Sequence, residues 1–215
     1  MIQSLQTEYK GIKFRSRLEA RWAVFFYETE SAWEYESEGY LLDNGLCYLP
    51  DFYIRNVQFG PKSYEDIYVE VKGEMTPLDS MKIRSFAGMK DLSDIEKDVL
   101  ESFDDEDIDE AFLTPIKPVV VLGNIPIGDS IYDIAASCNS QHWSSKYRAE
   151  FFSFGMLPKW DANYTAIPCI TKSGHFGLTD EYSLFDDWVD TYRTLKAYSS
   201  ALSARFEKQT IRRAI

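Results

Sequence analysis

The chain has 215 residues, enough for one large domain or for one domain with a modest extension. Its 45 % apolar and 27 % charged residues, with 14 Phe, 14 Tyr and 5 Trp, exclude a disordered, collagen-like or coiled-coil protein. No apolar stretch has the length of a membrane span or a signal peptide, and the three cysteines are an odd number at wide spacing. We therefore expect a globular, cytoplasmic protein without a disulfide framework.

The negative charge is concentrated in one segment. The formal net charge is −12, and the segment from Asp91 to Thr114 holds 11 acidic residues against the single basic Lys97. The rest of the chain is almost neutral, and basic residues gather near both of its ends. They are Lys10, Lys13, Arg15, Arg17 and Arg21, and then Arg193, Lys196, Arg205, Lys208, Arg212 and Arg213. This clustering allows binding to a phosphate backbone despite the acidic total.

The first predicted element is a helix over residues 14–28, because apolar side chains recur there at helical spacing. Aromatic and polar residues alternate over residues 33–43, which predicts a strand, and Asn44-Gly45 is typical of a two-residue hairpin turn. Residues 46–54 are predicted as the returning strand. Pro50 in its middle indicates an edge strand or a β-bulge at that point.

A third strand is predicted over residues 67–71, and a helix over residues 77–90 begins with a proline in its first turn. After the acidic segment, the apolar run 118–122 is typical of a strand that is buried on both faces. The predicted order is helix, three strands, helix, strand.

Two domains are expected. Residues 1–125 form the first, with residues 91–114 as an acidic insert. Residues 126–215 form an irregular subdomain, with short strands near residues 164–170 and a long basic helix over residues 182–211 that packs on the first domain.

Acidic side chains and a lysine are predicted to meet on the first sheet. Asp51 lies on the second predicted strand, and period-two alternation puts Glu70 and Lys72 on one face with Val71 in the core. Phosphodiester hydrolysis needs a hard divalent ion, carboxylates to hold it and a cation to orient water. We therefore assign Asp51, Glu70 and the Val71 carbonyl to Mg²⁺ or Mn²⁺ and Lys72 to catalysis. Glu19 on the first helix completes the catalytic, metal-binding set.

These residues resemble the PD-(D/E)XK nuclease superfamily over roughly residues 9–125. The segments 14–19 (FRSRLE), 48–52 (YLPDF) and 68–73 (YVEVKG) look like the N-terminal catalytic domain of transposon TnsA endonucleases. They look equally like small phage-encoded nucleases, which end in a helix with an element similar to residues 201–207 (ALSARFE). The acidic insert departs from that pattern.

The resemblance implies an α/β fold with a restriction-endonuclease-like core, in which helices flank a mixed central sheet. It also implies metal binding by Glu19, Asp51 and Glu70, and catalysis by Lys72.

Plain structural roles remain open for the same residues. Glu70 and Lys72 could form an exposed ion pair, and Asp51 could be a turn carboxylate after Pro50. Glu19 could belong to a solvated helix face.

The cysteines and histidines offer one possible zinc site. Cys138 and His142, and Cys169 and His175, have ligand-like spacing, but no Cys-x2-Cys knuckle is present. We do not expect structural zinc.

Two function classes remain. The first is a Mg²⁺-dependent DNA endonuclease, encoded by a phage or mobile element, whose DNA-binding residues are Lys13, Arg15, Arg17, Arg205, Lys208, Arg212 and Arg213. Cutting both strands would call for a homodimer or a partner protein, and no membrane is involved. The alternative is a non-catalytic DNA mimic or protein-binding inhibitor that uses residues 91–110. The complete Glu, Asp and Glu-x-Lys set favours the enzyme.

Overall fold

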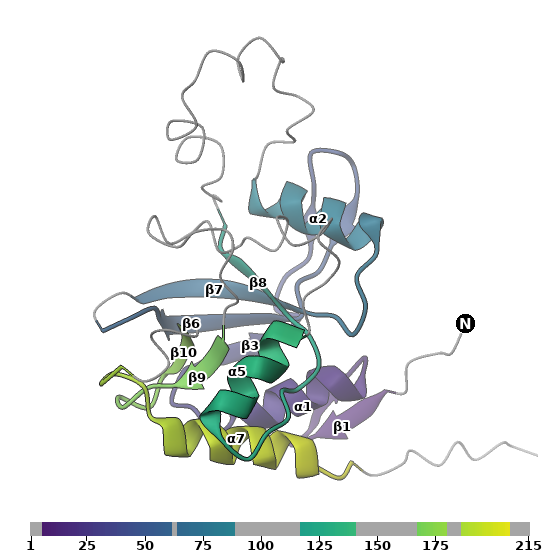
Figure 1. The fold of residues 1–215 in the computed structure, drawn as a ribbon. Coiled ribbons are helices and arrows are strands. Elements are labelled where there is room, and N and C mark those ends of the chain that lie inside the picture. The colour runs from purple at the N-terminus through teal and green to yellow at the C-terminus, as the bar shows by residue number, and fades with distance from the viewer. Residues whose placement is uncertain (1–5, 62–63, 89–116, 141–166, 180–185, 207–215) are drawn as a thin grey trace, which may run out of the picture.

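The computed structural model describes residues 6–61, 64–88, 117–140, 167–179 and 186–206, with residues 137–140 described by their backbone alone. The acidic segment 91–114 lies outside these residues. The described part is a mixed α/β fold in which helices cover both faces of a six-stranded mixed sheet. Figure 1 shows α2 (Pro77–Ala87) on one face of the sheet, and α1 (Arg17–Phe26), α5 (Ile131–Ser140) and α7 (Thr191–Ser203) on the other.

The strands follow the order β8 (Val119–Leu122), β7 (Tyr64–Val71), β6 (Phe52–Gln58), β10 (Phe176–Thr179) and β9 (Ile167–Ile170), and β3 (Trp33–Tyr35) pairs with the first half of β6. β7 runs antiparallel to β6 and parallel to β8. β10 runs parallel to β6 and antiparallel to β9. The predicted α/β class is confirmed, and the predicted element order recurs as α1, β3, β6, β7, α2 and β8.

α1 begins at Arg17, later than the predicted residue 14, because Ser16 caps its N-terminus. The Ser16 hydroxyl accepts a hydrogen bond from the Glu19 N–H at 3.1 Å. The preceding residues form the separate hairpin of β1 (Thr7–Tyr9) and β2 (Ile12–Phe14). Trp22 is buried, and its Nε1–H donates to the Gly123 carbonyl at 2.8 Å, which ties α1 to the end of β8.

The predicted hairpin between residues 33 and 54 is present but interrupted. β4 (Tyr40–Leu41) pairs with β5 (Cys47–Tyr48) around a turn in which the Gly45 N–H donates to the Leu42 carbonyl at 2.8 Å. Gly45 has φ +78°, and the Leu42 N–H donates to the Leu46 carbonyl. The turn is therefore a type I turn with a glycine bulge rather than the predicted two-residue turn.

Asp51 lies in a bend before β6, not on a strand as predicted. Pro50 separates β5 from β6, because proline lacks the N–H that a ladder needs. Across the hairpin, Glu36 adopts φ +46° and donates its N–H to the Asp51 carbonyl at 2.9 Å. The bend places the Asp51 side chain at the start of β6.

β7 and α2 follow the sequence pattern closely. Ile67, Val69 and Val71 are buried in the core shared with α1, so the predicted inward direction of Val71 is confirmed. α2 begins at Pro77, as predicted, with a capping box between Thr76 and Asp79. It ends at Ala87, before the predicted residue 90.

The C-terminal half differs more from prediction. The region expected to be irregular contains α5, and the β9–β10 hairpin extends the sheet beside β6. The predicted helix over residues 182–211 is much shorter: Asp190 caps α7, and the backbone is extended at Ala204 (ψ 127°). Residues 182–185 and 207–211 lie outside the described residues.

Two apolar clusters hold the sheet between its helices. The larger contains the buried faces of α1, α5 and α7 with β6, β7, β9 and β10, and the smaller contains α2 with the β4–β5 hairpin. In the described part of the chain, no helix has the length and apolar character needed to cross a membrane.

Candidate functional site

Asp51 is a buried carboxylate of the predicted site, and both of its oxygens have bonding partners. It is only 2 % exposed, and its Oδ2 accepts the Val71 N–H at 2.7 Å, so the bend before β6 is bonded to the end of β7. Its Oδ1 forms an ion pair with Nη2 of Arg15. Arg15 Nε in turn lies 2.5 Å from Glu36 Oε1, so the guanidinium bridges two carboxylates.

Glu70 and Lys72 lie on the same face at the end of β7, as predicted. Glu70 is 3 % exposed and accepts the Tyr48 hydroxyl at 2.8 Å. Its other oxygen lies 2.9 Å from Lys72 Nζ, which is also 3.2 Å from Asp79 Oδ1 on α2. The pair is buried on the Glu70 side, so the alternative of an exposed surface ion pair is wrong.

Glu19 is buried on the first turn of α1, and its side chain reaches back to the bend between β2 and α1. Its Oε2 accepts the Tyr35 hydroxyl at 2.6 Å and the Arg15 N–H at 3.0 Å. It is therefore not on a solvated helix face, and its charge acts on Asp51. These bonds also give Glu19 a structural role at the helix N-terminus.

Proton affinities in this cluster are strongly altered. Burial, followed by the charges of Glu70 and Glu19, raises the pKa of Asp51 to about 8. Burial also raises the pKa of Glu70, against the opposing effect of Lys72. Burial disfavours the charged form of Lys72, but Glu70 and Asp79 outweigh it and raise the pKa of that ammonium. Lys72 therefore stays a cation at neutral pH.

A pocket of about 190 Å³ opens beside this cluster. It is lined by Glu70, Lys72, Asp79, Lys82, Arg15 and the β5 segment Cys47–Leu49. Arg15, Lys72 and Lys82 give it cations from the β2–α1 bend, the end of β7 and α2. Lys82 was not predicted, although its place one turn after Asp79 on α2 is a signal that it shares that face.

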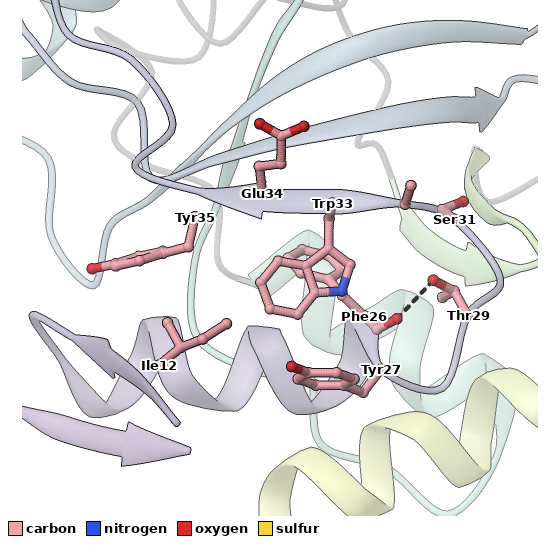
Figure 2. A pocket seen from close by; sticks show the side chains of 9 residues that line it. Ile12, Phe26, Tyr27, Thr29, Ser31, Trp33, Glu34 and Tyr35 are labelled. Atoms are coloured by element: carbon pink, nitrogen blue, oxygen red, sulfur yellow. Dashed lines mark hydrogen bonds between the residues drawn. The ribbon is translucent and has the colours of Figure 1, made fainter. Parts of the chain in front are cut away.

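A larger pocket of about 490 Å³ lies between α1 and β3 (Figure 2). Its wall is aromatic, with Phe26, Tyr27, Trp33 and Tyr35. The Thr29 hydroxyl in it donates to the Phe26 carbonyl at 2.7 Å, as drawn in Figure 2. Since Glu34 is its only charged lining residue, the smaller pocket is the better candidate for chemistry on a charged substrate.

The oxygen atoms of this cluster are of the type that a hard divalent ion prefers, but they are not arranged around a common point. Mg²⁺ prefers carboxylate and carbonyl oxygens, which Asp51, Glu70, Glu19 and Val71 supply. Yet in the part of the chain that the structure describes, no three His, Cys, Asp or Glu side chains gather closely enough to hold a metal ion. The Asp51 and Glu70 oxygens are instead bonded to Arg15, Val71, Tyr48 and Lys72.

The remaining predicted residues are spread over the molecule. Lys13 and Arg17 are exposed on either side of Arg15, and Arg205 is exposed just after α7. Lys208, Arg212 and Arg213 lie outside the described residues, as do His142 and the Cys138 side chain. Cys169 is fully buried in the core and His175 Nδ1 lies 3.0 Å from the Ser173 hydroxyl.

Comparisons with known proteins found no match: no family model, no curated protein and no solved structure matches this chain.

Proposed function

We propose that this chain is a metal-dependent nuclease of the PD-(D/E)XK type that hydrolyses phosphodiester bonds in DNA. One observation carries the proposal. Asp51, from the bend before β6, lies with Glu70 and Lys72, from the end of β7, at one end of the sheet, where the three are buried or half-buried. Beside them is a pocket that Arg15, Lys72 and Lys82 line together with Glu70 and Asp79. Buried titratable groups in such a pocket are typical of catalytic sites.

The excess of negative charge in the cluster favours a divalent cation. Burial disfavours the ionised forms of Asp51 and Glu70 and raises the pKa of each, and the charge of Glu70 raises the pKa of Asp51 further. Asp51 and Glu70, with Glu19 and the Val71 carbonyl, would hold Mg²⁺ or Mn²⁺. When bound, the ion would offset negative charge on the reacting phosphate.

Lys72 would act as a fixed cation rather than as a base. Its raised pKa keeps it protonated at neutral pH, and Glu70 and Asp79 hold its Nζ at 2.9 and 3.2 Å. From there it would orient a water molecule and stabilise charge that develops on the phosphate. Arg15, Lys72 and Lys82 line the pocket beside the carboxylates and suit a phosphate backbone. The choice of DNA as the proposed substrate follows from the resemblance in sequence.

The test is a cleavage assay on several nucleic acids. Labelled linear DNA, supercoiled DNA, a four-way junction and RNA are incubated with the protein in Mg²⁺, Mn²⁺ or EDTA. We expect cleavage of at least one DNA substrate with metal only, and loss of cleavage in Lys72→Gln. Lys172→Gln, at the exposed β9–β10 turn, is the control and should cut normally. No cleavage by the parent protein in either metal, or parental cleavage by Lys72→Gln, would contradict the proposal.

A further inference from the structure

The guanidinium of Arg15 pairs with Oδ1 of Asp51, one of the two oxygens with which Asp51 would bind a metal ion. Asp51 Oδ2 is fixed by the Val71 N–H at 2.7 Å, a backbone group inside the sheet. Oδ1 is the Asp51 oxygen that a side chain engages, and Arg15 Nη2 bonds to it. A cation that binds Asp51 through Oδ1 would therefore compete with Arg15.

We propose that Arg15 is the resident counter-ion of Asp51: a positioning residue that stabilises the carboxylate cluster without metal and competes with a divalent cation for Asp51. This inference rests on the proposed function. The sequence suggested DNA binding as the role of Arg15, and this inference gives Arg15 a second role.

Arg15 is better placed to leave the cluster than Lys72 is. Its side chain is 51 % exposed, against 29 % for Lys72. Arg15 lies in the bend between β2 and α1, and its backbone N–H is held by Glu19 and Tyr35, so the side chain can turn while the backbone stays fixed. Each cation pairs with two carboxylates, Arg15 with Asp51 and Glu36, and Lys72 with Glu70 and Asp79, so the difference between them is the exposure of the side chain.

The local charge balance sets the direction of the effect. Carboxylates outnumber cations in this cluster, where Glu19, Glu36, Asp51, Glu70 and Asp79 surround Arg15 and Lys72. At a pH above the pKa of Asp51, removing the Arg15 charge makes the site more negative and frees Asp51 Oδ1. Both changes strengthen binding of a divalent cation.

The test measures Mn²⁺ binding by isothermal titration calorimetry on the full-length chain. Arg15→Gln is compared with the parent protein and with Arg55→Gln, a matched control. The Arg55 side chain is also 51 % exposed and also pairs with a carboxylate, Glu34, but that pair lies away from Asp51. We expect Arg15→Gln to bind Mn²⁺ about tenfold more tightly and to melt at a lower temperature without metal. Arg55→Gln should match the parent in Mn²⁺ affinity. Unchanged or weaker Mn²⁺ binding in Arg15→Gln overturns the inference.

A second measurement needs no substitution. The Arg15 Nε–H resonance of the parent protein is followed by NMR during a Mg²⁺ titration, with that of Arg55 as the reference. We expect the Arg15 signal to move towards that of a solvated arginine and the Arg55 signal to stay. If Mg²⁺ binds and the Arg15 signal is unchanged, the inference is wrong.

The outcomes separate this inference from the nuclease proposal. Tighter Mn²⁺ binding by Arg15→Gln without DNA cleavage by any variant leaves the inference and removes the nuclease. Metal-dependent cleavage with equal Mn²⁺ affinities removes the inference alone. Absence of Mn²⁺ binding in the parent and in Arg15→Gln overturns both.

Discussion

The Asp51 carboxylate accepts the backbone N–H of Val71 at 2.7 Å. This bond joins the bend that Pro50 creates to the end of β7, and it fixes Asp51 beside Glu70, the residue that precedes Val71. The hydrogen-bonded sheet thereby holds two buried carboxylates close together, a placement that costs free energy unless protons or cations compensate their charge.

The first prediction concerns the pH dependence of stability. The pKa of Asp51 is raised from its ordinary 3.8 to about 8, so the folded protein keeps a proton that the unfolded chain releases. The free energy of unfolding should therefore fall as the pH rises from about 4 to about 8 and then level off. Asp51→Asn should be more stable than the parent protein by about 1–3 kcal/mol at pH 9 and nearly equal to it below about pH 4.

Urea denaturation of both proteins at several pH values without metal measures this difference. A difference that stays constant with pH would show that Asp51 is ionised throughout, contrary to the effect of its burial.

The second prediction concerns the hydroxyl of Tyr48. It donates to buried Glu70 at 2.8 Å, so Tyr48→Phe leaves a buried carboxylate oxygen without that donor. We expect a loss of about 2 kcal/mol in the free energy of unfolding. Tyr53→Phe is the control, because the Tyr53 hydroxyl donates to Asp66 at 2.9 Å at the surface. It should cost less than about 0.5 kcal/mol, and equal losses in chemical denaturation would argue against the buried Tyr48–Glu70 bond.

The third prediction tests the pocket as a phosphate site. Lys82 lines it with Arg15 and Lys72, so Lys82→Ala should weaken DNA binding. The slope of log affinity against log salt should become shallower by about 1, because one fewer phosphate is neutralised. Lys172→Ala should leave that slope unchanged. Fluorescence anisotropy with labelled DNA at several salt concentrations gives both slopes, and equal slopes for the parent and Lys82→Ala would place the DNA elsewhere.

The fourth prediction tests how β10 packs in the sheet. A Cβ at Gly177 would lie 2.8 Å from Thr171 Cγ2 and 3.0 Å from Cys169 Sγ, so Gly177→Ala should cost about 2 kcal/mol in the free energy of unfolding. Gly39→Ala is the control, since the nearest atom to its Cβ is the Tyr48 carbonyl oxygen at 4.0 Å. Thermal or urea unfolding compares the two. A neutral Gly177→Ala would mean that β10 does not pack as closely against Thr171 and Cys169 of the β9–β10 hairpin as described.

Local sequence patterns predicted the parts of the fold that local forces determine. Alternation at Ile67, Val69 and Val71 predicted β7 and the buried direction of Val71, and the first-turn proline Pro77 predicted the start of α2. The predicted meeting of Glu70 with Lys72 follows from the same alternation.

Features that depend on distant contacts were missed. Pro50 predicted an interruption of the strand near Asp51, but no local pattern reveals the left-handed conformation of Glu36, whose N–H donates to the Asp51 carbonyl across the hairpin. The predicted C-terminal helix was too long because Trp188 and Val189 continue its apolar spacing, although Val189 instead bridges to Thr171 of the β9–β10 turn. Lys82 reaches the pocket only because α2 packs beside β5, and that packing is tertiary.

The most direct test of the nuclease proposal is the initial rate of DNA cleavage in Mg²⁺ by Asp51→Asn and Asp66→Asn, measured beside the parent protein. Both changes remove one carboxylate charge, but Asp66 is exposed on β7 and bonds to Tyr53 and the Asn56 N–H, outside the cluster. We predict that Asp51→Asn loses cleavage by at least about 100-fold, as expected when a ligand of a catalytic ion is removed, while Asp66→Asn keeps the parental rate. Parental cleavage by Asp51→Asn, or equal losses in the two variants, would contradict the account.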